Sequence, residues 1–204
     1  MKAYKKVYDR LYEIASSQQG YFTSKQAVAA GYADNTHPFH VKSGNWIREY
    51  RGIYRLVRYP QTERPDLVLW FLWSRNRNDE PQGVYSHQTA LSIYELSDIM
   101  PPKLHMTVPP GFRRNSEIPK VLVLHRARLH ENEIESMQGF RVTSCLRTIS
   151  DLIVDGSVPS DILKQAVREA LKRGLISRAG VQNSTLLSDT VRDRVSVIIR
   201  ELSL

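Results

Sequence analysis

The chain has 204 residues, of which 41% are hydrophobic, and its formal net charge at pH 7 is +8. This length suits one large domain or two small ones, each with a buried core. The single cysteine, Cys145, excludes a disulfide framework and a cysteine-rich zinc cluster, and the longest apolar run, Leu67 to Trp73, is far shorter than the roughly 20 residues of a membrane span.

The positive charge is concentrated in the first part of the chain. Residues 1–60 contain ten Lys and Arg against four Asp and Glu, whereas residues 61–204 contain nineteen against seventeen. Such a basic segment is typical of a module that binds phosphates, because each neutralised phosphate releases counterions. The N-terminus is charged throughout and has no apolar signal region, so we expect a cytoplasmic protein without a membrane segment.

The first predicted element is a helix from Lys2 to Ser17. Its apolar residues, among them Val7, Leu11 and Ile14, recur at helical spacing, and we expect them to pack under the elements that follow. The short segment from Tyr21 to Thr23 is a candidate third strand beside the hairpin described next.

Residues 24–56 predict a winged helix-turn-helix. Ser24 suits the N-cap of a short helix that Gly31 ends, and Pro38 lies in the first turn of a second helix. Two runs rich in aromatic and β-branched residues follow, separated by Arg51-Gly52, which suits a hairpin turn that requires positive φ. In a winged helix-turn-helix the second helix enters the major groove of DNA and the hairpin rests on the backbone.

The predicted winged helix-turn-helix indicates which side chains contact DNA. In the second helix we expect His37, His40 and Lys42 to reach base edges, while Phe39 and Val41 face the core. The histidines can also be surface positions without function, and a metal site is not indicated because no carboxylate or cysteine joins them at suitable spacing. We expect contacts mainly to phosphates from the flanking residues and the wing, namely Ser24, Lys25, Asn35, Thr36, Arg48, Tyr50, Arg51, Arg55 and Arg58.

A proline-containing segment without periodicity, Tyr59 to Pro65, predicts a boundary between a DNA-binding domain at residues 1–60 and a second domain at residues 61–204. The apolar helix that Pro65 opens, ending at about Arg77, is expected to be buried in the second domain. We therefore predict an α+β fold in which the winged helix-turn-helix precedes a mixed α/β domain with a small sheet and several helices, with strands at 104–108, 121–124 and 140–143 and helices at 87–96, 145–153, 159–173 and 189–202.

Signatures of catalysis are not found in the sequence. A phosphate-binding glycine loop, an HExxH zinc motif and a Gly-x-Ser-x-Gly nucleophile are all missing, so we predict no catalytic residue, metal or cofactor. One basic stripe has two interpretations. Lys164, Arg168 and Lys172 share a helix face, with Arg173 beside them, and form either an ordinary solvated surface or a contact surface for an acidic partner or nucleic acid.

Several longer motifs resemble one family. The first part contains Gly20-Tyr-Phe-Thr-Ser-Lys-Gln-Ala and Tyr50-Arg-Gly-Ile-Tyr-Arg-Leu, and the second contains Tyr85-Ser-His-Gln-Thr-Ala-Leu-Ser and Val142-Thr-Ser-Cys-Leu-Arg-Thr-Ile-Ser-Asp-Leu. These segments resemble AbiEi-type antitoxins, the transcriptional regulators of bacterial toxin–antitoxin and phage-defence (abortive infection) operons. The sequence departs from that family's pattern at Glu95, where glycine is expected, and at Cys145, where proline is usual.

The resemblance implies a repressor that binds double-stranded DNA in its own promoter, at inverted repeats. It also implies a genetic partner, a nucleotidyltransferase-like toxin, in many cases without a stable complex between the two proteins. We expect the antidote activity in residues 61–204, with the basic stripe as its candidate surface. The competing hypothesis is a nuclease or other enzyme with a winged-helix targeting domain, and the lack of an acid–acid–lysine motif in the second domain favours the antitoxin.

Overall fold

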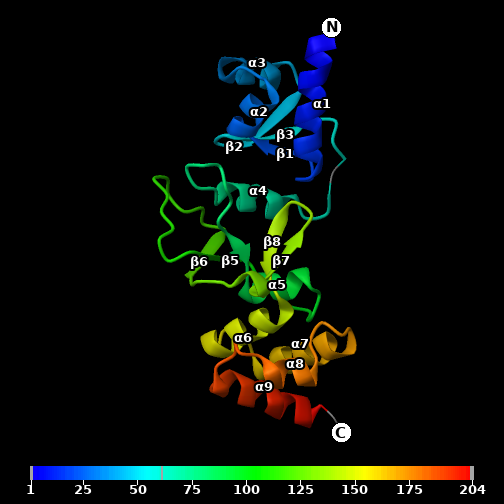
Figure 1. The fold of residues 1–204 in the computed structure, drawn as a ribbon, viewed down its shortest axis with the longest axis vertical. Helices are drawn as coiled ribbons and strands as arrows, with labels where there is room; N and C mark the ends of the chain where they lie inside the picture. Colours follow the sequence, from blue (N-terminus) through cyan, green and yellow to red (C-terminus); the bar gives the residue numbers. More distant parts are fainter. Residues whose placement is uncertain (1, 61, 203–204) are drawn as a thin grey trace. The chain divides into compact units, whose positions relative to one another are not determined.

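The computed structural model describes residues 2–60 and 62–202, and of residues 2–4 the backbone only. These residues form two compact units (Figure 1). The first holds the chain up to Gly83 together with Ser136–Arg141, and the second holds Val84–Glu135 and the chain from Val142 on. The sequence predicted a boundary at residue 60. Residue 61 lies outside the described part of the chain, and the units divide instead at Gly83.

The first unit contains a winged helix-turn-helix. Its strands form an antiparallel sheet in the order β1-β3-β2, so the predicted third strand at residues 21–23 pairs with the hairpin. In chain order its elements are α1 (Lys2–Ser16), β1 (Tyr21–Thr23), α2 (Ser24–Ala30), the 3-10 turn η1 (Asp34–Thr36), α3 (His37–Lys42), β2 (Trp46–Tyr50), β3 (Ile53–Leu56) and α4 (Pro65–Trp73).

Local sequence explains the ends of these elements. Gly31 ends α2 with a φ of 114°, and Gly52 allows the hairpin turn with a φ of 69°, both in the left-handed region that favours glycine. The N-cap of α2 is Thr23, not Ser24 as the sequence predicted. Thr23 is still extended at the end of β1, so its hydroxyl accepts from the amide of Gln26 while the Gln26 side chain accepts from the amide of Thr23.

Helix α4 corrects a second prediction. We expected this apolar helix to be buried in the second domain, but it belongs to the first unit, where it lies against β1 and β3. Leu67, Val68 and Leu72 are each at most 2% exposed. Their burial confirms that the helix needs an apolar partner, and the partner is the winged-helix sheet.

The second unit combines a sheet with a group of helices. The strand order is β6-β5-β4-β8-β7, with β4 antiparallel to β5 and parallel to β8, and β5 parallel to β6. Its elements are β4 (Val84–Tyr85), α5 (His87–Ile93), β5 (Leu104–Val108), β6 (Leu122–Arg126), the 3-10 turn η2 (Glu131–Glu133), β7 (Ile134–Met137), β8 (Phe140–Thr143), α6 (Cys145–Asp155), α7 (Ser160–Lys172), α8 (Arg178–Asn183) and α9 (Asp189–Glu201), the tip of the β7–β8 hairpin being counted with the first unit.

The helices of the second unit pack on one another. Helix α6 lies against α5, α7 and α9, and Figure 1 shows α6 to α9 gathered beyond the strands. Apolar side chains from three of these helices, Ile149, Val167 and Ile198, are fully buried. The predicted amphipathic helices are thus confirmed, and each needs its neighbours to bury its apolar stripe.

Candidate nucleic-acid interface

Helix α3 is anchored by its two histidines. The His40 ring stacks on Trp46 at 4.6 Å between centroids, and the His37 ring lies 5.3 Å from the same indole. His37 is 2% and His40 7% exposed, so the prediction that they reach base edges is wrong. Burial lowers the pKa of both imidazoles below the usual value, which keeps them neutral at pH 7. Their role is to hold α3 on the sheet.

The opposite side of α3 is solvent-exposed. The side chain of Phe39 is 65% exposed, although the sequence predicted that it faces the core. Val41 does pack against the core, as predicted. Because a helix turns once in 3.6 residues, anchoring positions 37, 40 and 41 turns the intervening positions outward. We define the outer face of α3 as Pro38, Phe39 and Lys42 together with Asn35 of the preceding turn η1, all of which are exposed.

The wing, which follows α3 in the sequence, has exposed arginine side chains. Arg48 on β2, Arg51 at the hairpin turn and Arg58 after β3 are exposed. Arg55 differs, because its guanidinium is half-buried and lies 2.8 Å from the Glu49 carboxylate, which neutralises it. Arg48, Arg51 and Arg58 therefore remain exposed on and beside the wing, while Arg55 stabilises the hairpin.

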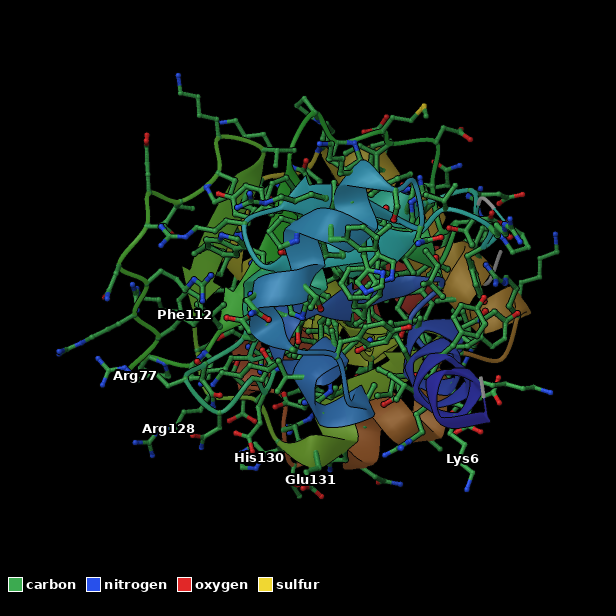
Figure 2. The ribbon with its side chains drawn as sticks, turned by 90° about the horizontal axis from the view of Figure 1, so that it is seen from above. Lys6, Arg77, Phe112, Arg128, His130 and Glu131 are labelled. Atoms are coloured by element: carbon green, nitrogen blue, oxygen red, sulfur yellow. The ribbon has the colours of Figure 1, made fainter. Side chains whose placement is uncertain are left out.

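The other residues that the sequence predicted to contact DNA differ in how exposed their side chains are. The Lys25 ammonium is exposed and donates to the backbone carbonyl of Arg77, and Figure 2 shows the Arg77 side chain extending from the body of the molecule. Ser24 is half-buried, and the Thr36 hydroxyl donates to a backbone carbonyl in its own turn. The Tyr50 ring packs edge to face, at 5.4 Å, against a tryptophan of α4. These contacts leave Tyr50 and Ser24 less exposed than the two arginines.

The basic stripe on α7 is partly neutralised. The Lys164 ammonium lies 2.7 Å from the Glu201 carboxylate, and that of Lys172 lies 4.0 Å from Glu169. The Arg173 guanidinium donates to a backbone carbonyl near α5. Arg168 is exposed, and among the described residues no hydrogen bond or ion pair is found for it. Three of the four predicted cations thus have partners that sequence spacing did not reveal.

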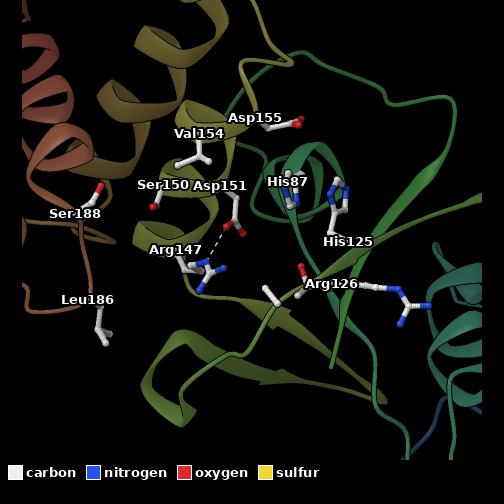
Figure 3. Close-up of a pocket in the computed structure, with 12 residues that line it drawn as sticks. His87, His125, Arg126, Arg147, Ser150, Asp151, Val154, Asp155, Leu186 and Ser188 are labelled. Atoms are coloured by element: carbon white, nitrogen blue, oxygen red, sulfur yellow. Dashed lines mark hydrogen bonds and ion pairs between the residues drawn. The ribbon is translucent and has the colours of Figure 1, made fainter. Parts of the chain in front are cut away.

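The second unit also contains a cavity of about 550 Å³ (Figure 3). Its wall includes His87 on α5 and His125 on β6, whose ring centroids are 3.6 Å apart in a stacked arrangement, and His105 Nδ1 lies at hydrogen-bond distance, 3.0 Å, from His125 Nε2. Burial lowers the pKa of His87 to about 4, and the neighbouring histidines act in the same direction. The sequence contained no signal of this histidine cluster, because its members come from the three separate elements α5, β5 and β6.

Arg147 forms the other wall of this cavity (Figure 3). Its guanidinium lies 2.8 Å from Glu133 and 2.7 Å from Asp151. These carboxylates are 4% and 8% exposed, so one cation joins two buried anions. The Arg-Thr-x-x-Asp-Leu motif read from the sequence therefore provides both ends of a buried ion pair within α6.

The described residues, 2–60 and 62–202, contain neither a candidate metal site nor a candidate membrane span. No group of three or more His, Cys, Asp or Glu side chains there is arranged so that it could hold a metal ion. No helix in that part of the chain is long and apolar enough to cross a membrane.

Comparison with known proteins supports the fold and the resemblance. The crystal structure of the RV2827C protein from Mycobacterium tuberculosis is similar in fold, with a TM-score of 0.60 and 9% sequence identity over 97% of this chain and 77% of that one. No curated protein matches the chain in sequence. Residues 9–57, which lie within the first unit and include both helices and the wing, match the family described as "Transcriptional regulator, AbiEi antitoxin". The resemblance predicted from the motifs is thereby confirmed for residues 9–57.

Proposed function

We propose that the protein binds duplex DNA through the winged helix-turn-helix, with α3 in the major groove and the β2–β3 hairpin on the adjacent backbone. The observation that carries this proposal is the arrangement of the first unit. Two buried histidines anchor a short helix, its outer face is free, and the following hairpin carries exposed Arg48 and Arg51. The match of residues 9–57 to a family of transcriptional regulators supports it.

Within this proposal, the target is the promoter of the protein's own operon, at inverted repeats. The protein is then a cytoplasmic autorepressor and the antitoxin of a nucleotidyltransferase-like toxin, with the antidote activity in residues 61–204. The family description, which names an antitoxin, supports this assignment. A nucleotidyltransferase-like reading frame next to the gene, and loss of promoter activity in a reporter strain that expresses the protein, are the observations that this part requires.

DNA binding is tested by gel shift with the full chain on the DNA upstream of its own reading frame. Affinity should fall linearly with salt on logarithmic axes, with a slope of about −0.9 for each phosphate contacted. Replacing both Arg48 and Arg51 by alanine should weaken binding on promoter and random duplexes alike and reduce the slope by about 2 if each holds one phosphate. Arg128→Ala, at an exposed arginine of the second unit outside the basic stripe, is the matched control.

Two results would contradict the proposal. One is a wild-type chain that binds no duplex at low salt. The other is an unchanged salt slope for the double variant, which would place the phosphate contacts elsewhere on the molecule.

A further inference from the structure

The outer face of α3 carries an aromatic side chain that the core does not use. Phe22, the other phenylalanine of the winged-helix motif, is fully buried, whereas Phe39 is 65% exposed. Exposing so large an apolar side chain forgoes the free energy that burial would contribute. The outer face also includes the polar Asn35 and Lys42 and the small apolar ring of Pro38, so Phe39 is its one large apolar side chain.

The Phe39 ring packs against a second aromatic ring of α3. It contacts the edge of the His40 ring in a T-shaped arrangement, with 5.7 Å between centroids and an angle of 79°. His40 in turn stacks on the buried Trp46. This row of three rings orients Phe39 before any partner arrives, which reduces the side-chain entropy lost on binding.

The major groove offers one apolar group to such a side chain. Base edges there present hydrogen-bond donors and acceptors, and thymine alone adds a C5-methyl group. Apolar side chains, phenylalanine among them, read thymine by contact with this methyl. The chemistry of the outer face thus matches a site in which one or more thymines lie opposite Phe39.

We propose that Phe39 determines sequence specificity by contacting thymine C5-methyl groups in the major groove. This inference rests on the proposed function, since it requires α3 to lie in that groove. The role in base recognition that the sequence suggested for His37 and His40 is thereby assigned to Phe39. The two histidines are buried, whereas Phe39 is the one large apolar side chain on the outer face.

The test compares two forms of the same promoter fragment, amplified either with thymidine or with deoxyuridine triphosphate. Uracil keeps the base pair and removes only the methyl group. The wild-type full chain should bind the uracil fragment about fourfold more weakly for each methyl contacted, the ratio expected from the transfer of one methyl group out of water. Phe39→Ala should bind the thymine fragment more weakly and show no difference between the two fragments.

Two variants serve as controls. Phe39→Leu keeps an apolar side chain and should retain part of the discrimination. Val57→Ala removes an apolar side chain that is 41% exposed and lies outside α3, and it should discriminate as the wild type does. Thermal unfolding of each variant should be unchanged, because the replaced side chains are exposed.

The outcomes separate this inference from the proposed function. If wild type binds duplexes with a steep salt dependence but does not distinguish thymine from uracil, DNA binding stands and the role of Phe39 is refuted. Equal discrimination by wild type and Phe39→Ala refutes it as well. If Phe39→Ala alters the mass of the protein in sedimentation without DNA, Phe39 packs against a second copy instead. A failure to bind any duplex overturns both proposals.

Discussion

Arg147→Met is the substitution that most directly tests the second unit. Arg147 lies in a motif that resembles a family signature. The presence of arginine at this position can therefore have a structural or a functional cause. The structure indicates a structural role, because the Arg147 side chain is 19% exposed and its guanidinium pairs with Glu133 and Asp151. Methionine keeps the apolar stem of the side chain and removes the charge, so the packing in α6 changes little.

The expected cost follows from the two anions left behind. Glu133 and Asp151 are almost completely buried, and without Arg147 they become unpaired charges in a poorly solvated site. Breaking such a buried pair typically costs about 3–5 kcal/mol of unfolding free energy. Burial already raises the pKa of Asp151 above its usual value, despite the opposing effect of Arg147. Removing the cation raises the folded-state pKa further, so the folded state of the variant binds more protons than the unfolded chain.

This linkage gives the variant a distinctive pH dependence. Because the folded state of Arg147→Met binds extra protons, the free energy of unfolding of this variant should fall as pH rises. The loss of unfolding free energy relative to wild type should therefore be larger at pH 8 than at pH 5. Hydrogen exchange read by mass spectrometry should show lost protection in peptides from residues 142–204. The three tryptophans, at positions 46, 70 and 73, all lie in the first unit, so their fluorescence reports on the other part of the chain.

Two comparisons make the result interpretable. Arg168→Met, on the exposed side of α7, should stay within about 0.5 kcal/mol of wild type. Adding Glu133→Gln and Asp151→Asn to Arg147→Met should restore part of the stability, because the unpaired charges are gone. The reasoning is refuted if Arg147→Met retains wild-type protection and stability at neutral pH. Loss of antidote activity in such a stable variant would assign the motif to function instead.

Two further predictions concern the same unit. The second unit should lose stability as pH falls from about 6.5 towards 4, because burial lowers the pKa of His87 to about 4 and the unfolded chain then binds more protons than the folded one. Hydrogen exchange across this range measures the loss, and His87→Gln should reduce its pH dependence. In co-expression with the toxin, Arg168→Glu should weaken growth rescue more than Lys164→Glu, since Lys164 is already paired with Glu201. Equal rescue by both variants and wild type would show that this surface is only solvated.

Several features of the fold could be predicted from the sequence because their causes are local. The hairpin turn at Arg51-Gly52 requires positive φ, and glycine is the residue that adopts it without strain. Alternating or helical spacing of apolar residues predicted β5, α6, α7 and α9 within a few residues. The strands β4 and β7 were not predicted from the sequence.

The candidate site shows where local reasoning stops. In α3 the sequence contains His37, Phe39, His40 and Val41, and spacing alone does not say which of these the core accepts. Trp46, on the next strand, decides it by stacking on His40, and Phe39 is thereby turned to solvent. Polarity suggested the opposite orientation, because an imidazole is usually more exposed than a phenyl ring.

The sequence by itself determined the order of the winged-helix elements, the basic character of residues 1–60 and the need of α4, α6, α7 and α9 for apolar partners. Only the tertiary structure decided which surface each helix buries and which charges remain free. Helix α4 packs on the winged-helix sheet, and Lys164 meets Glu201 from a helix 37 positions away in sequence. The physical reason is range: turns and caps depend on neighbouring residues, whereas burial and ion pairing depend on side chains that only folding brings together.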